Sequence, residues 1–233
     1  MFKNKQKSPK GERSRAHLLA AALKLFRRRG FEATTMRDIA KEANMALGAV
    51  YHYFPSKASI VLAYYWSTQA AHVVAFEEGA AKASDLRSQL TLLIRSRLDV
   101  VGKDRKFLPA LAQLAIDPAN PLSVFSSQSS ELRRQSIALC AQALRQAGLS
   151  DELVELFAPV VWAGLLGFLL LYVFDRSPKQ RITFQILEET IDVAVPLFYA
   201  SAMPELAPLR ERIGDLFQRF GLAAFLQNSG KEI

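Results

Sequence analysis

The stretch that decides the fold is TTMRDIAKEANMALGAVYHYFPSK, residues 34–57. Its pattern is typical of two short helices that are separated by a tight turn and followed by an aromatic cluster. Thr35 stands three residues before Asp38, the spacing of a capping box, so we expect the first helix to begin at Thr34 or Thr35. Asn44 follows where that helix must stop, and asparagine tolerates the left-handed backbone conformation better than any residue except glycine.

The second helix of this stretch, from Met45 or Ala46 to Tyr53, is predicted to have a bare outer face. Lysine and glutamate would be expected on an ordinary helix surface, but here the outer positions are small or apolar. A bare face favours insertion into a groove, as in a helix-turn-helix whose second helix enters the DNA major groove. A plain helical hairpin within a globular core explains the spacing equally well. The outer positions and the aromatic end are Ala46, Leu47, Gly48 and Ala49, then Tyr51, His52, Tyr53 and Phe54.

The run from Gly30 to Lys57 resembles the DNA-binding signature of the tetracycline-repressor (TetR) family of bacterial regulators. The matching elements are G-F-x-A-T-T-x-x-D-I-A and G-x-V-Y-x-Y-F-x-S-K. The chain departs from the family pattern at three positions. Asn44 replaces the usual turn glycine, and Ala46 replaces the serine or threonine that usually caps the second helix. Leu47 stands where a polar residue is frequent, so base reading there would be apolar, for example of a thymine methyl group.

The resemblance implies an all-α chain with two domains. Residues 1–57 would form a basic tail and a three-helix, helix-turn-helix DNA-binding domain, and residues 58–233 a larger helical domain for effector binding and dimerisation. Phosphate contacts would set register and most of the affinity, whereas the few base contacts would discriminate. The implied phosphate-binding residues are Thr35, Tyr51, His52 and Lys57, and those facing base edges are Ala46, Leu47, Gly48 and Ala49.

The distribution of charge agrees with a nucleic-acid partner. The chain has 233 residues, of which 50% are hydrophobic, and a formal net charge of +8. Residues 1–57 hold 13 Lys and Arg against 4 Asp and Glu, whereas residues 58–233 hold 17 against 18. All the excess positive charge therefore lies with the helix-turn-helix, as expected of a DNA-binding face.

Helices are predicted on both sides of this motif. An apolar stripe predicts a first helix from near Glu12 to Arg29, ended by Gly30. Three arginines in its last turn, residues 27–29, are interpreted as a solvated helix end that complements the helix dipole rather than as DNA contacts. Lys57 opens a long helix towards Glu78 without an intervening linker, so a shift of that helix could move the DNA-binding unit rigidly.

The rest of the chain predicts further helices and a dimer. A stretch of seventeen residues without a charge, 158–174, just reaches the length of a membrane span, but Pro159 and the flanking acidic residues oppose that interpretation. A soluble helix that is apolar all round must be covered, which favours a symmetric four-helix-bundle dimer. The expected helices are Asp85–Val101, Phe107–Ile116, Leu122 or Ser130–Ala147, Ser150–Phe174, Ser177–Ser201 and Pro204–Phe225. The expected interface residues are Trp162, Gly164, Gly167, Ile186, Thr190 and Leu197.

The aromatic side chains of the second domain suggest a cavity for a small apolar or amphipathic effector. The alternative is that these side chains only fill the core. The candidates are Trp66, Phe76, Phe107, Phe125, Phe168 and Tyr172, with Trp162 part of the same aromatic supply.

Catalytic and metal-binding patterns are not found in the sequence. Cys140 is the single cysteine, and His17, His52 and His72 lie far apart. We therefore expect no enzyme activity, no cofactor and no metal. The N-terminus lacks the apolar core of a signal peptide, so a cytoplasmic location is expected.

The leading hypothesis is a homodimeric, ligand-responsive transcriptional regulator that binds a palindromic double-stranded DNA operator, with repression favoured. The alternatives are an activator or partner-sensing regulator of the same fold and, from a different class, a membrane-associated protein that handles lipid.

Overall fold

The computed structural model describes residues 9–219 except 106 and 118–119, and this part of the chain is helical and contains no strand. Short 3-10 segments, Ser127–Ser129, Pro178–Gln180 and Pro204–Leu206, precede α7, α9 and α10. The helices are α1 (Pro9–Arg29), α2 (Met36–Glu42), α3 (Leu47–Tyr53), α4 (Lys57–Ala80), α5 (Leu86–Gly102), α6 (Leu108–Ile116), α7 (Ser130–Gln146), α8 (Asp151–Phe174), α9 (Arg181–Ser201) and α10 (Ala207–Arg219).

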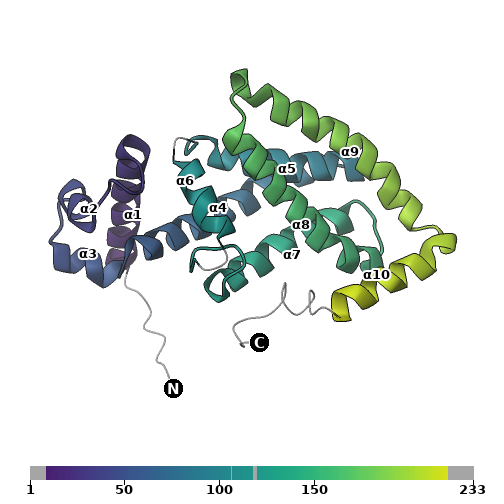
Figure 1. The fold of residues 1–233 in the computed structure, drawn as a ribbon, viewed down its shortest axis with the longest axis horizontal. Coiled ribbons are helices and arrows are strands. Elements are labelled where there is room, and N and C mark those ends of the chain that lie inside the picture. The colour runs from purple at the N-terminus through teal and green to yellow at the C-terminus, as the bar shows by residue number, and fades with distance from the viewer. Residues whose placement is uncertain (1–8, 106, 118–119, 220–233) are drawn as a thin grey trace.

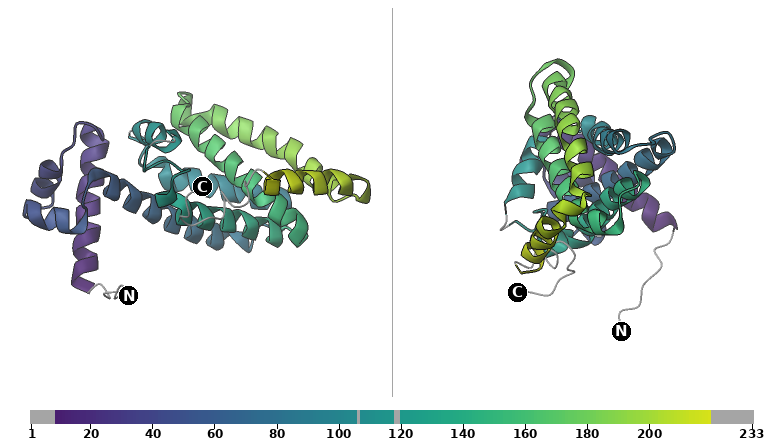
Figure 2. Two further views of the ribbon diagram at one scale, coloured as in Figure 1. Left: turned by 60° about the horizontal axis from the view of Figure 1, so that its bottom comes forward. Right: turned by 90° about the vertical axis from the view of Figure 1, so that its right-hand side faces the viewer.

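The helices form a small cluster and a larger one. Helices α1, α2 and α3 lie together at one end of the molecule, and α4 runs from them into the larger bundle (Figure 1). Helices α9 and α10 lie on the far side of that bundle, away from α3, in Figure 1 and in the left-hand view of Figure 2. The long α4 is therefore the continuous element that joins the helix-turn-helix to the rest.

Side-chain caps set the start of the principal helices. Ser56 accepts a hydrogen bond from the backbone N–H of Ser59 at the start of α4, and Asp85 does the same for Ser88 at the start of α5. Such caps satisfy backbone donors that the first helical turn leaves without partners. Burial of an apolar face then fixes each helix in the bundle.

Three residues with positive φ end helices as the sequence predicts or allows. Gly30 ends α1 with φ +86°, and Asn44 takes φ +51° in the turn between α2 and α3. The prediction of a left-handed asparagine at this turn is confirmed. Gly148, with φ +85°, ends α7 in the same way.

One predicted helix boundary is corrected, and one of two predicted alternatives is confirmed. Helix α1 already contains Pro9, the first described residue, so it extends further towards the N-terminus than Glu12; proline is well tolerated in a first helical turn, where its missing N–H has no helical partner. Helix α7 begins at Ser130 and not at Leu122, because the preceding segment folds into turns. There the Ser129 hydroxyl donates to the carbonyl of Ser123 over 2.6 Å. The predicted basic tail and the predicted last turns up to Phe225 extend outside the described residues.

Helix α8 is long and apolar enough to cross a membrane, and it is the one such helix within the described residues. Core helices of soluble proteins pass the same test of length and composition. An 18-residue window of α8 is 44% buried inside this chain. One side of α8 therefore packs in the bundle and the other side is left uncovered by this chain.

Candidate nucleic-acid interface and interior cavity

A reciprocal cap and a shared core hold the helix-turn-helix together. The Thr35 hydroxyl accepts from the N–H of Asp38 over 3.2 Å, and the Asp38 carboxylate accepts from the N–H of Thr35 over 2.9 Å. The Thr35 hydroxyl also donates to the Asp38 carboxylate over 2.7 Å, and this hydrogen bond, together with that from the Thr35 N–H, lowers the pKa of Asp38. The predicted capping box is confirmed. The His17 ring of α1 also donates to the carbonyl of Ala43 over 3.0 Å, which ties α1 to the end of α2.

Helix α3 presents a partly bare surface, and it is narrower than the sequence predicts. Val50 is fully buried beneath the helix, and Leu47 and Ala49 are half-buried, with Leu47 packed against the core. Leu47 faces the core in part because it lies three residues before Val50 on the helix. The exposed positions, called the reading face below, are Ala46, Gly48, Tyr51 and His52.

Two details of the reading face bear on close approach. A Cβ atom built at Gly48 meets no other atom within 4 Å, so this stretch of backbone is open to a partner. The Ala46 side chain makes no cap hydrogen bond at the start of α3, as its replacement of serine or threonine predicts.

Lys57 has a structural role that the sequence did not reveal. Its ammonium donates to the carbonyls of Phe31 over 2.9 Å and Glu32 over 3.4 Å, and it lies 4.4 Å from the centre of the Phe31 ring. Lys57 therefore fastens the start of α4 to the turn between α1 and α2. Its phosphate contact stays a prediction, and replacing Lys57 would disturb this junction as well as any DNA contact.

All three arginines at the end of α1 are paired with acidic side chains, Arg27 with Asp104. Arg28 lies 3.8 Å from Glu42, which also pairs with Lys24 over 2.5 Å, and Arg29 lies 3.5 Å from Asp38. These cations hold α1 against α2. The sequence predicted a solvated helix end, whereas the structure shows ion pairs within the helix-turn-helix.

Two exposed cations that the sequence analysis did not select lie on α2, the helix that packs against α3. Arg37 and Lys41 are exposed on α2 and form no ion pair within the described part of the chain. Their separation of four residues places them on one side of α2. That spacing next to a helix-turn-helix was the signal that could have identified them as phosphate-binding candidates.

The larger bundle encloses a cavity between α4, α5, α6, α7 and α8. The space open to the centre of a water molecule is about 130 Å³. Most of the wall is aliphatic, and a few polar side chains meet at one part of it. The principal aliphatic residues are Leu108, Leu111, Ile116, Leu166, Leu169 and Val173, and the polar ones include Tyr65, Thr68, Arg97 and Ser136.

The aromatic residues predicted for an effector pocket do not line this cavity, so their contact with an effector stays a prediction. Phe76 is fully buried in the core, Phe107 stacks on Tyr64, and Trp66 and Phe125 are exposed by 37% and 42%. The selection followed residue type and could not resolve which way each helix face points. The six predicted residues that are absent from the cavity wall are Trp66, Phe76, Phe107, Phe125, Phe168 and Tyr172.

A buried carboxylate connects the cavity wall to the helix-turn-helix. Asp104, which is 0% exposed, accepts from the Nε of Arg27 in α1 over 2.6 Å and from the hydroxyl of Tyr64 in α4 over 3.0 Å. Tyr64 also lines the cavity. Burial and the neighbouring Asp104 carboxylate raise the pKa of Tyr64, so its phenol stays protonated and donates. We call this arrangement the Arg27–Asp104–Tyr64 link.

An exposed apolar surface covers parts of α8 and α9. Five of the six residues predicted for a dimer interface are exposed in the single chain. Trp162 is 5% exposed and lines the cavity instead, which corrects its assignment. The exposed predicted residues are Gly164, Gly167, Ile186, Thr190 and Leu197, and Val160, Leu171, Phe174, Ile182 and Val193 extend the same α8–α9 face.

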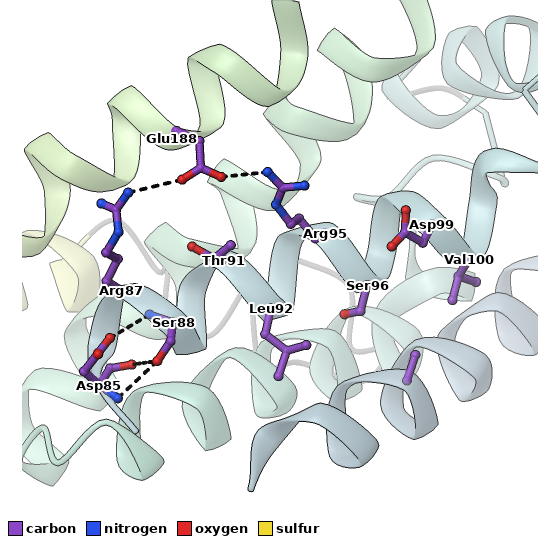
Figure 3. A pocket seen from close by; sticks show the side chains of 11 residues that line it. Asp85, Arg87, Ser88, Thr91, Leu92, Arg95, Ser96, Asp99, Val100 and Glu188 are labelled. Atoms are coloured by element: carbon purple, nitrogen blue, oxygen red, sulfur yellow. Dashed lines mark hydrogen bonds and ion pairs between the residues drawn. The ribbon is translucent and has the colours of Figure 1, made fainter. Parts of the chain in front are cut away.

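A second hollow, open to solvent, lies along the outer side of α5 (Figure 3). Glu188 of α9 accepts from Arg87 over 3.2 Å and from Arg95 over 2.7 Å. Arg87 also pairs with Asp192. The cations of this hollow are therefore already neutralised by carboxylates, and they dock α9 on α5.

Two family models match the chain. The model for bacterial regulatory proteins of the tetR family covers residues 18–64. The model for the tetracyclin repressor-like C-terminal domain covers residues 89–213. The first match contains the helix-turn-helix, and the second contains most of the bundle around the cavity.

Curated relatives are transcriptional regulators. The probable regulator ArpR of Pseudomonas putida is 30% identical over 184 residues, which cover 69% of this chain and 81% of ArpR. The transcriptional repressor KstR2 of Rhodococcus jostii is 51% identical over 47 residues, 20% of this chain and 23% of KstR2. The match to the regulator YuxN of Bacillus subtilis covers 30% of that protein, so the chain spans less than a third of YuxN and of KstR2.

Solved structures share the fold. The fatty acid degradation regulator FadR of Bacillus halodurans aligns with a TM-score of 0.60 at 18% identity, over 80% of this chain and 96% of FadR. GusR of Salmonella enterica aligns with a TM-score of 0.58 at 20% identity, over 83% of this chain and all of GusR.

Proposed function

We infer, from the premise that this chain belongs to the TetR family of bacterial regulatory proteins, how its parts divide the work of a transcriptional regulator. The chain is a helix-turn-helix regulator that binds DNA. We propose that it is a cytoplasmic repressor that acts as a homodimer on a palindromic operator, and that a small amphipathic effector releases it. The observation that carries this proposal is the reading face of α3, with open backbone at Gly48.

The reading face would enter the major groove, and exposed side chains around it would hold phosphates. Tyr51 and His52 are exposed on α3, and Arg37 and Lys41 are exposed cations on α2. Two copies of α3 must lie about 34–36 Å apart to meet successive turns of one duplex. This spacing requires a dimer, and the α8–α9 face offers the apolar surface for one.

Release of the operator would follow from a change in the spacing of the two α3 helices. The Arg27–Asp104–Tyr64 link and the continuous α4 both join the cavity wall to α1–α3. An effector that fits better when Tyr64 moves would therefore bias the position of α1. A coupling free energy of about 1–3 kcal/mol between the two sites is ordinary for such a device.

The test begins with the DNA that flanks the protein's own gene. Footprinting should protect one palindromic site, and the variant Gly48→Ala should bind that site at least about tenfold more weakly. The added methyl group meets open space in the free protein, and alanine has a higher helix propensity than glycine, by up to about 1 kcal/mol. Operator binding should therefore fall while thermal stability is kept or rises.

Gly214→Ala is the matched control, because Gly214 is also helical with open space around its Cα. It should leave operator binding unchanged. Unaltered operator affinity in Gly48→Ala, or no protected site on any flanking DNA, would contradict the proposal that α3 enters the groove.

A further inference from the structure

Arg97 places a half-buried cation in the wall of the interior cavity. It extends from α5, its Nη1 atom is buried, and that atom has no hydrogen-bond partner. No carboxylate forms an ion pair with Arg97 within the part of the chain that the structure describes, and burial lowers the pKa of its guanidinium. A guanidinium remains protonated in proteins, so Arg97 keeps its positive charge in the cavity wall.

The neighbouring arginines of the same helix show the contrast. Arg87 and Arg95 both reach Glu188 on the outer side of α5, as Figure 3 shows. Arg97 is two residues beyond Arg95 and belongs to the interior cavity instead. Burying a charge without a partner destabilises a fold, so such a residue calls for an explanation.

A second donor in the same cavity also has no partner. The hydroxyl of Tyr65 is buried and forms no hydrogen bond, and burial raises its pKa, so the phenol stays protonated. His72 does not neutralise the site, because its Nε2–H donates to the carbonyl of Leu93 over 2.9 Å and burial keeps the ring uncharged at neutral pH. The cavity wall thus holds two guanidinium groups and a neutral donor. Arg133 donates to the carbonyl of Val124 over 2.6 Å, whereas the Nη1 atom of Arg97 and the hydroxyl of Tyr65 lack an acceptor.

The rest of the wall excludes a small inorganic anion as the natural occupant, because it is mostly aliphatic. An occupant must place hydrocarbon against residues such as Leu111, Leu166 and Leu169 while it supplies oxygen acceptors to Arg97 and Tyr65. A carboxylate is planar and matches the fork of a guanidinium, so it fits this small space better than a bulkier anion.

We propose that the cavity binds an amphipathic monocarboxylate, whose anionic head pairs with Arg97 and accepts a hydrogen bond from Tyr65 and whose hydrocarbon chain lies along the leucine wall. This assignment rests on the proposed function only in taking the cavity as the effector site. The proposal names the chemical class of the effector, whereas the composition of the domain predicted only that the effector is apolar or amphipathic.

The first experiment compares three probes of equal chain length on the purified full-length protein. Decanoate, decanol and decylamine are titrated below their aggregation concentrations, with calorimetry and thermal unfolding as readouts. Decanoate should raise the melting temperature and bind at least tenfold more tightly than decanol, and decylamine should bind most weakly. Decanol binding as tightly as decanoate, or no decanoate binding at millimolar concentration, would overturn the proposal.

The second experiment assigns the head group to Arg97. Arg97→Met should lower decanoate affinity at least tenfold, should leave decanol affinity unchanged, and should raise the melting temperature of the ligand-free protein. Arg97→Lys, which keeps the charge, should retain part of the decanoate affinity, and Tyr65→Phe should lower it a few-fold. These two variants carry the test if Arg97→Met does not fold.

Arg95→Met is the matched control, because it removes an arginine from the same helix outside the cavity. Its decanoate affinity should equal that of the wild type. An unchanged decanoate affinity in Arg97→Met, or equal losses in Arg97→Met and Arg95→Met, would show that the head group does not meet Arg97.

Direct binding is measured without DNA, so the two proposals fail separately. If decanoate binds through Arg97 but leaves operator affinity unchanged, the release mechanism is wrong and the ligand class stands. If a neutral apolar compound releases the operator and decanoate does not bind, the ligand class is wrong and the regulatory function stands.

Discussion

At the scale of single residues, the ion pairs within the protein decide which cations are available to bind DNA phosphates. The exposed cations of α2 are the simplest case, because Arg37 and Lys41 make no ion pair within the described residues, whereas Arg28 and Arg29 do. A cation that is already paired within the protein has less to offer a phosphate. Position in the sequence alone does not make this distinction, since all four lie in the basic N-terminal segment.

Arg37→Ala should weaken binding to specific and non-specific DNA alike. Loss of one phosphate contact releases one counterion fewer, so the slope of log affinity against log salt should become about one unit shallower. Fluorescence anisotropy over a series of salt concentrations measures the slope. Lys82→Ala, an exposed cation in the turn after α4, is the control and should leave the slope as it is. A wild-type slope in Arg37→Ala would remove this residue from the interface.

His72 predicts a pH dependence of stability. Burial lowers its pKa from 6.5 to about 4 in the folded protein, and the charge of Arg97 acts in the same direction. The unfolded chain therefore binds more protons than the folded one between these values, so stability rises with pH across this window. The stabilisation is complete above about pH 6.5 and is lost as the pH falls towards 4.

The full effect of a shift of that size is on the order of 3 kcal/mol. Urea unfolding at a series of pH values should show the decline in wild type, and His72→Gln should lack this part of it. A decline of the same steepness in His72→Gln would assign the acid sensitivity to other groups.

At the scale of elements, the sequence predicted the helices and their caps well because these depend on neighbours in the chain. Thr35 and Asp38, Asn44, and Gly30 act through contacts within a few residues, and each takes its predicted role. It was harder to predict which side of α8 is buried and which aromatic side chains point inward. Whether Trp162 points inward or outward depends on α4 and α7, which periodicity within a uniformly apolar helix does not reveal.

The cavity and the junctions between elements were not predictable from local pattern. Arg27, Tyr64 and Asp104 lie in separate segments, and their meeting depends on the packing of α1, α4 and the turn after α5. Lys57 shows the same limit, because its partners Phe31 and Glu32 lie over twenty residues away. Polar contacts between residues far apart in the sequence thus define the cavity and these junctions, and composition and local pattern do not predict such contacts.

The Arg27–Asp104–Tyr64 link should behave as one energetic unit between α1 and α4. Arg27 and Tyr64 share Asp104, so the effects of Arg27→Met and Tyr64→Phe on unfolding free energy should not add, with a coupling of about 0.5–3 kcal/mol. Chemical denaturation of the two single variants and the double variant measures it. Arg28→Met is the matched control, since Arg28 pairs with Glu42 and should combine additively with Tyr64→Phe. Additivity in both cycles would mean that Asp104 does not couple the two helices.

At the scale of the whole molecule, the uncovered α8–α9 face and the spacing of a palindromic operator point to the same assembly. Single exposed apolar side chains are normal, but a contiguous apolar surface on two adjacent helices marks an interface. A second copy would cover α8 and place two reading faces on one duplex. A membrane could also cover α8, but in that case the protein would need detergent to stay in solution.

Leu197→Asp distinguishes these outcomes. Leu197 is 64% exposed in the single chain, so a charge there costs the fold little, whereas in a two-fold interface the same charge would be buried twice. Wild-type protein should be dimeric in detergent-free gel filtration with light scattering, and Leu197→Asp should be monomeric with unchanged helicity. Its affinity for the palindrome should fall to that for a half-site, because each monomer carries a single reading face. Val74→Asp, which charges a 54% exposed position on α4, should remain dimeric and bind the operator normally. A dimeric Leu197→Asp would move the interface away from α9, and a wild type that stays soluble only with detergent would favour the membrane.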